Sequence, residues 1–419
     1  MSIFQIIALL LVLAGGFGLL NHHVLRLPTT VGLVFSALAV SFGAILLDRL
    51  LPGLGIGETA RSLITRIDFA EALMQGMLSF LLFAGALHVN IADLSREKWT
   101  VGVLASGGVL LATFLVGLGL HLALDVPFLI ALVFGALISP TDPVAVMGIL
   151  KTVRVPKSLE TRIGAESLLN DGVGVVIFLV MVALAFGAGH GDTSIGPVEV
   201  VKLFAAEAVG GALLGALAGW IAFQAIRSVD EYTLEVILTL ALVAGTYALA
   251  SVIHVSGPIA VVVAGLIIGN RGMEQGMSET TRLHVRSFWH LTDEILNAIL
   301  FLLIGFEVLA IAFDASQVLA ALVAIPLTLA ARLISVSLPL AALRLTGRLE
   351  KGAIAIMTWG GLRGGISVAL ALSLPEGEWK PLILTATYAV VIFSICVQGL
   401  TVGPLIRRAS GLEARPEQG

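Results

Sequence analysis

Charged residues are scarce in this sequence, because Asp, Glu, Lys and Arg together make up 12% of its 419 residues. Hydrophobic residues make up 58%, and the mean hydropathy of +1.04 lies far above the range of globular proteins. So little charge leaves no stretch that could form a soluble domain of useful size. The composition therefore indicates a polytopic membrane protein embedded in the lipid bilayer.

Cysteine and the common catalytic motifs are also missing or nearly so. Cys396 is the single cysteine, which rules out a disulfide within the chain. The net charge is −4 and no loop carries a basic cluster, so we expect no nucleic-acid partner. No Gly-x-Ser-x-Gly or His-Glu-x-x-His motif and no suitably placed pair of aspartates occurs. We therefore expect neither an enzyme nor a cofactor.

Long apolar runs fill the chain instead, and a spanning helix needs about 20 mostly apolar residues. The first run has no basic region before it and no clear cleavage site after it, so we interpret it as a span rather than a signal peptide. The ninth run is too short to cross upright. The sequence predicts an all-α fold of about thirteen spans, at residues 3–20, 29–47, 70–87, 101–124, 127–149, 160–187, 198–225, 231–253, 257–269, 288–312, 316–343, 352–374 and 381–405.

The orientation follows from the Lys and Arg residues in alternate loops, which are enriched on the cytoplasmic side. Seventeen of the 24 lie on the side of the carboxyl terminus and five on the other side. The remaining two, Arg332 and Arg363, fall inside apolar spans. This predicts an external amino terminus and a cytoplasmic carboxyl terminus, which requires an odd number of spans.

The fifth span is interrupted by Ser139-Pro140-Thr141-Asp142-Pro143. A proline lacks an N–H group and clashes with the preceding turn, so carbonyls near Ala136 and Ser139 should lose their helical partners. Irregular backbone at this depth is tolerated only where it is buried in protein or lines a cavity. The break therefore predicts a polar site, although a proline kink capped by Asp142 would account for this segment alone.

The sixth span carries Glu166-Ser167-Leu168-Leu169-Asn170-Asp171-Gly172. Residues four apart share a helix face, so Ser167 lies above Asp171 and Glu166 lies above Asn170 on the neighbouring face. Hydroxyl, amide and carboxylate oxygens can then converge, and hard cations such as Na⁺ prefer oxygen ligands. Asp171 has no basic residue nearby in its own span, which argues against a purely structural role.

The twelfth span contains Trp359-Gly360-Gly361-Leu362-Arg363-Gly364-Gly365, with four glycines around a buried arginine. Glycine pairs loosen a helix and let backbones approach closely. This span follows the span with the Pro-Asp-Pro break by seven. Because seven is an odd number, the two spans cross the membrane in opposite directions. Two interrupted helices in corresponding positions of inverted halves are typical of secondary transporters with a site near the midplane.

The segments SPTDPVAV, ESLLNDG and GGLRGG, in this order and spacing, resemble the monovalent cation:proton antiporter family, in its sodium/proton exchanger branch of the prokaryotic NhaP type. The resemblance covers essentially the whole chain. It implies one transport domain with inverted repeats, at about 1–190 and about 230–406, two broken helices that cross in the core, and a short tail at 407–419. It also implies a homodimer in a bacterial inner membrane, with a role in pH homeostasis.

The resemblance further assigns roles to individual residues. It implies that Asp171 carries protons and cations alternately, and that Asn170 supports the site. The ligands of Na⁺ or Li⁺ would be Asp171, Ser167, Thr141 and Asp142, the last directly or through water. Glu166 and Arg363 match a buried ion pair. Relatives often carry an acidic residue where this chain has Ala84, so any ligand role of that carboxylate is absent here.

The mechanism also follows from charge. Desolvation favours the neutral form of a carboxylate, so a proton and Na⁺ compete for one negative charge. An empty charged site is costly to move through the membrane, and this couples the two fluxes. With Asn170 beside Asp171, one carboxylate changes occupancy per cycle, which predicts electroneutral exchange. A K⁺/proton exchanger and, less readily, a cation channel stay open as alternatives, and for Glu307 and Arg332 the sequence suggests structural pairing or snorkelling.

Overall fold

The computed structural model describes residues 3–50, 76–144, 146–147, 150, 155–187, 197–310, 315–343 and 352–409, and all regular elements in these ranges are helical. Besides short π-helical and 3-10 segments, the labelled α-helices are α1 Ile3–Leu20, α2 Thr29–Leu50, α5 Leu78–His88, α6 Ile91–Gly102, α7 Val109–Leu124, α8 Phe128–Ile138, α10 Lys157–Phe186, α11 Pro197–Arg227, α12 Tyr232–Val252, α13 Gly257–Ile267, α14 Glu279–Glu307, α15 Ala315–Leu343, α16 Ala353–Trp359, α17 Gly365–Leu372, α18 Lys380–Phe393 and α19 Gly399–Ala409.

The all-α prediction is confirmed. Within the described ranges, nine helices are long and apolar enough to cross a membrane, and α5 and α8 are shorter apolar helices. The number of thirteen spans stays a prediction, as do the two inverted repeats. The first residues of the expected span 70–87 and the tail beyond residue 409 lie outside the described residues.

Two spans begin well before the residues at which the hydropathy pattern places them. One continuous helix runs from Ile91 to Leu124 through a π-helical segment, although its predicted start is residue 101. Its true start is marked by Asn90, whose side chain accepts hydrogen bonds from the backbone N–H groups of the first turn. α14 likewise begins at Glu279 after the capping side chain of Ser278, not at residue 288. Both first turns carry charged residues, which a hydropathy window excludes.

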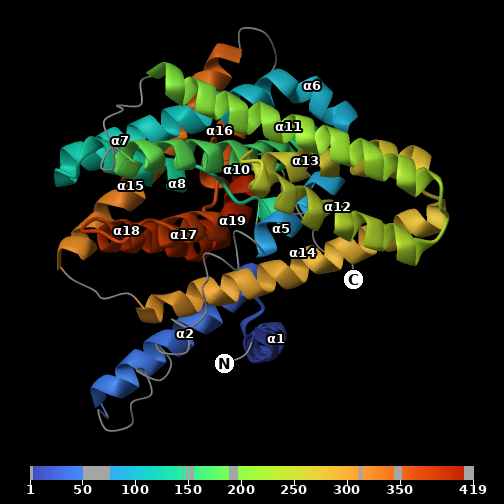
Figure 1. The fold of residues 1–419 in the computed structure, drawn as a ribbon. Helices are drawn as coiled ribbons and strands as arrows, with labels where there is room; N and C mark the ends of the chain where they lie inside the picture. Colours follow the sequence, from blue (N-terminus) through green and yellow to red (C-terminus); the bar gives the residue numbers. More distant parts are fainter. Residues whose placement is uncertain are drawn as a thin grey trace.

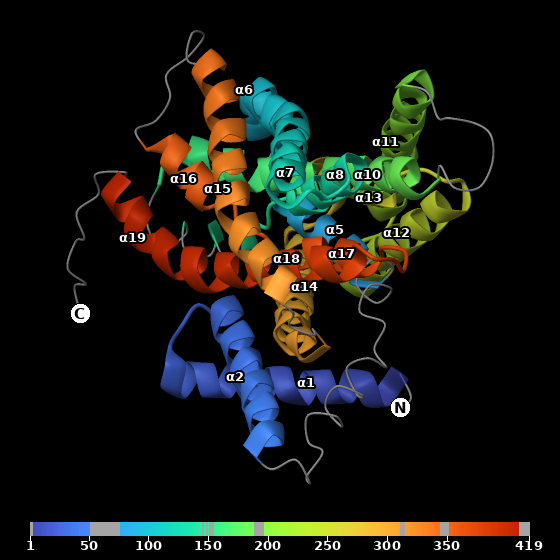
Figure 2. The same cartoon turned by 90° about the vertical axis from the view of Figure 1, so that its left-hand side faces the viewer.

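The helices form two groups that differ in position (Figures 1 and 2). α7 packs against α8 and α15, and α15 packs in turn against α18. In the other group α2 lies along α14, and α13 packs against α5, α11 and α12. α1 and α2 lie at one edge of the molecule, beside α14. α10 contacts helices of both groups, which places its polar residues between them.

Both interrupted spans break where the sequence predicts. α8 ends at Ile138 and helical structure resumes at Val144, while α16 ends at Trp359 and α17 begins at Gly365. The two breaks meet in an isolated antiparallel bridge, in which the Asp142 N–H donates to the Leu362 carbonyl at 2.8 Å. Backbone groups freed by one break are therefore satisfied by the other, as a buried interruption requires.

Candidate ion-binding site

The broken segment is attached to α10 by an amide clamp. Asn170 accepts a hydrogen bond from the Thr141 N–H through Oδ1 at 3.2 Å and donates to Thr141 Oγ1 through Nδ2 at 2.8 Å. Thr141 Oγ1 also lies 3.0 Å from Ser167 Oγ. The predicted convergence of Thr141, Ser167 and Asn170 is therefore present. Both ends of the Asn170 amide are occupied, which makes Asn170 a positioning residue for Thr141.

Asp142 caps the resumed helix. Its Oδ1 accepts a hydrogen bond from the Val144 N–H at 2.8 Å, which holds the carboxylate beside the break. Gly364 lies against the same carboxylate, because a Cβ atom at this position would overlap Asp142. The close approach of the two breaks therefore requires glycine here.

A cavity of about 950 Å³ connects these groups with the surface. Thr141, Asp142 and Asp171 line it, and Asp171 is 7% exposed. At its outer end lies Lys157, whose side chain is 77% exposed and pairs with Asp93 at 2.8 Å. The wall thus carries the buried Asp171 carboxylate and the half-buried Asp142 carboxylate at its inner end. Ser167 and Asn170 lie behind this wall and are fully packed.

Arg363 does not form the predicted ion pair with Glu166. Its Nη1 donates to the carbonyls of Ser139 at 2.5 Å and Pro140 at 2.8 Å, which are carbonyls that the proline break has freed. These two carbonyls, which lack helical partners, are therefore satisfied by a resident guanidinium.

Glu166 pairs with Arg332 instead. Arg332 donates to both carboxylate oxygens, at 2.5 and 2.9 Å, and Glu166 is 1% exposed. The forked guanidinium of Arg332 faces Glu166 directly in this bidentate geometry. The pair ties α10 to α15, and Arg332 also donates to the Met357 carbonyl at the end of α16.

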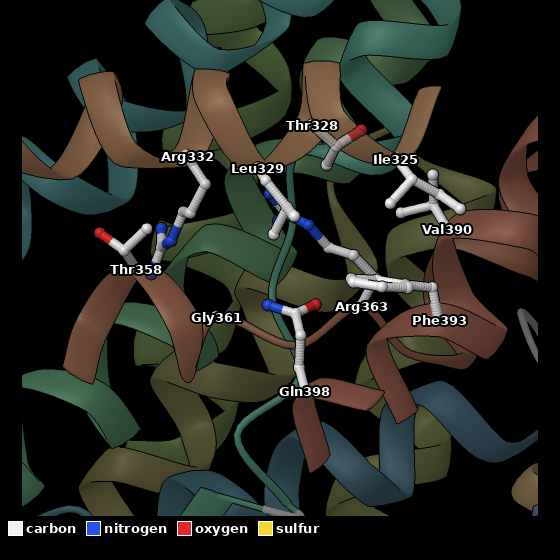
Figure 3. A pocket seen from close by; sticks show the side chains of 10 residues that line it. All are labelled: Ile325, Thr328, Leu329, Arg332, Thr358, Gly361, Arg363, Val390, Phe393 and Gln398. Atoms are coloured by element: carbon white, nitrogen blue, oxygen red, sulfur yellow. The ribbon is translucent and has the colours of Figure 1, made fainter. Parts of the chain in front are cut away.

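Sequence reasoning missed the support on the far side of Arg363. The Arg363 N–H donates to Ser394 Oγ, Ser394 donates to Gln398 Oε1, and Gln398 donates to the Trp359 carbonyl. Figure 3 shows the Gln398 amide between the side chains of Arg332 and Arg363. The sequence signal that could have indicated this support was the presence of a serine and a glutamine within an apolar span.

Ala84 and Glu307 lie away from the cavity wall. Ala84 is fully buried among apolar residues of α5, α12, α13 and α14, so this position serves packing. Glu307 is buried at the end of α14. Neither residue lines the cavity that reaches Asp171.

Two interrupted helices that meet beside the buried Asp171 carboxylate, at the inner end of a cavity, define a secondary transporter of cations. The family model described as "Sodium/hydrogen exchanger, transmembrane" matches residues 6–408. The chain belongs to this family, which is one of transporters and not of enzymes.

Named relatives agree with this assignment. The chain is 48% identical to the Na⁺/H⁺ antiporter NhaP of Pseudomonas aeruginosa over 93% of this chain and 92% of that protein. It is 36% identical to the Na⁺/H⁺ antiporter NhaH of Halobacillus dabanensis, with 92% of each chain covered. The solved structure of the sodium proton antiporter MjNhaP1 from Methanocaldococcus jannaschii matches with a TM-score of 0.75 at 20% identity, over 97% of this chain and 98% of that one. That match shows the fold.

Proposed function

We propose that this protein exchanges Na⁺, and also Li⁺, for H⁺ in a 1:1 ratio by alternating access. The observation that carries the proposal is the Asp171 carboxylate, which is buried at the inner end of the cavity beside Asp142 and the clamped Thr141. One carboxylate in a desolvated position holds either a proton or a cation, because each neutralises the same charge.

The ion position we assign uses the side-chain oxygens of Asp171, Asp142, Thr141 and Ser167. Thr141 Oγ1 accepts from Asn170 and contacts Ser167, and each hydroxyl oxygen has two lone pairs. The hydroxyls can therefore coordinate a cation without breaking the Asn170 clamp. Because Asn170 carries no charge, a single titrating carboxylate accounts for the proposed stoichiometry.

Under the orientation predicted from the Lys and Arg count, the cavity opens to the cytoplasm. Its mouth is lined by Lys157 at the start of α10 and by Asn90 and Pro28 in loops, all on the predicted cytoplasmic side. The structure would then represent an inward-open state in a bacterial cell membrane. Movement of the helix group that contains α7, α8, α15 and α18 relative to the group that contains α2 and α14 would expose the site to the other side. We also infer a homodimer, from family membership.

The test is proton flux in proteoliposomes after addition of Na⁺, Li⁺ or K⁺ across a range of pH. We expect Asp171→Asn to abolish exchange with an unchanged melting temperature, since the amide retains the shape and loses the titratable charge. Asp230→Asn is the matched control, because Asp230 is exposed and remote from the cavity wall. Robust exchange by Asp171→Asn would refute the assignment of Asp171 as the carrier. A larger proton flux with K⁺ than with Na⁺ would refute Na⁺ as the preferred substrate.

A further inference from the structure

A second, much smaller cavity lies behind the ion site, between α15, the α16–α17 break and α18. Its volume is about 10 Å³, which is the space of one water molecule. Thr328 and Arg332 of α15, Thr358 of α16, Arg363 of the break and Gln398 line it (Figure 3). It is separate from the large cavity, with which it shares none of these residues.

Two hydroxyl groups in this wall lack partners. Within the described part of the chain, Thr328 Oγ1 and Thr358 Oγ1 are buried and make no hydrogen bond to protein. Thr328 as a whole is 3% exposed. A buried hydroxyl without a partner destabilises the folded state, and proteins usually satisfy such groups with ordered water.

The remaining polar groups of the wall are mainly hydrogen-bond donors. Arg363 uses Nη1 for the Ser139 and Pro140 carbonyls, while its Nε and Nη2 carry three further N–H groups. Gln398 Oε1 accepts from Ser394 and keeps one lone pair, so the wall has few free acceptors beside these donors. The two guanidinium groups disfavour a cation. An occupant must therefore accept hydrogen bonds, and the volume selects one water over a larger halide ion.

We propose that this cavity holds one structural water that links α15 to the α16–α17 break through Thr328, Thr358 and the guanidinium groups. The water supports Arg363 from behind while Arg363 holds the freed carbonyls of the other break. This role is independent of which cation the protein transports. It concerns the rigidity of the break and not the exchange chemistry.

The sign of a stability change tests the proposal. If the cavity is dry, Thr328→Val removes an unsatisfied hydroxyl at nearly constant volume, and the melting temperature stays or rises. If water is bound there, the same change removes one of its partners, and we expect a fall of roughly 1 to 3 °C. Thr358→Val should act in the same direction. An unchanged or raised melting temperature in both variants overturns the proposal.

A matched control and a direct observation complete the test. Thr387→Val also removes a buried hydroxyl, but Thr387 Oγ1 donates to the Ile383 carbonyl within its own helix. The change in melting temperature of this variant therefore measures the effect of losing one ordinary hydrogen bond. A high-resolution structure should show one density peak within hydrogen-bonding distance of Thr328 Oγ1, absent in Thr328→Val. An anomalous peak at this place from protein prepared in bromide would assign a halide and overturn the water.

Discussion

At the scale of single residues, Arg332 takes the partner that was expected for Arg363, and Arg363 has a different task. Arg332 neutralises the buried Glu166, and Arg363 holds backbone carbonyls of the broken helix. Both arginines are visible in the sequence as charges within apolar spans. Their partners could not be predicted, because the rotation and spacing of α15 relative to α10 decide which guanidinium reaches Glu166.

Arg332→Ala should lower the stability of the protein strongly. It leaves the Glu166 carboxylate buried without a counter-charge, which costs about 3 to 5 kcal/mol. The melting temperature in detergent measures the effect. Replacing both partners, as in Arg332→Met with Glu166→Met, should restore most of it, since no buried charge remains. A single variant as stable as the unmodified protein would contradict the assigned pairing.

Arg363→Ala should affect transport more than stability. Its loss deprives the Ser139 and Pro140 carbonyls of charged donors, so the segment that carries Thr141 and Asp142 relaxes. Hydrogen bonds from a charged group contribute about 1.5 to 3 kcal/mol each, so the Na⁺ concentration for half-maximal exchange should rise at least about tenfold. A drop in melting temperature as large as that of Arg332→Ala, with unchanged half-saturation, would reverse the two roles.

At the scale of elements, the positions of the two helix breaks could be predicted because proline and glycine mark them. That the breaks hydrogen-bond to each other, through Asp142 and Leu362, could not be predicted from one sequence. The grouping of Thr141, Ser167 and Asn170 was predicted, since it depends on helical spacing in α10 and on family resemblance. The support from Ser394 and Gln398 was not, because isolated polar residues in a span carry no partner information.

Gly364→Ala tests the close contact between the breaks. The added methyl group would overlap the Asp142 carboxylate, so either the carboxylate or the bridge has to shift. We expect exchange to fall by about tenfold or more, as for a displacement of a functional group by around 1 Å. Gly377→Ala is the control, since its Cβ atom would meet nothing within 4 Å. Equal activity of both variants would show that the contact is not required.

At the scale of the whole molecule, the charge moved per cycle follows from the number of carboxylates that change occupancy. If Asp171 alone does so, no net charge crosses the membrane, although each uncompensated charge would feel roughly 2.3 kcal/mol per 100 mV. In proteoliposomes with imposed K⁺-diffusion potentials, the pH gradient at which net flux stops should follow the sodium gradient alone. A shift of this null point with voltage would implicate a second titrating group, with Asp142 as the first candidate.

The guanidinium of Arg363 in the proline break has a consequence for the kinetics of the transport cycle. Carbonyls freed in a broken helix need a hydrogen-bond partner, and here the Arg363 guanidinium, which is part of the chain, is that partner. The local geometry then does not depend on the cargo, so the site need not refold each time it is emptied. The turnover rate should then be set by the rigid-body movement of the two helix groups. The time that the protein spends without a bound ion should depend on the contacts between these groups.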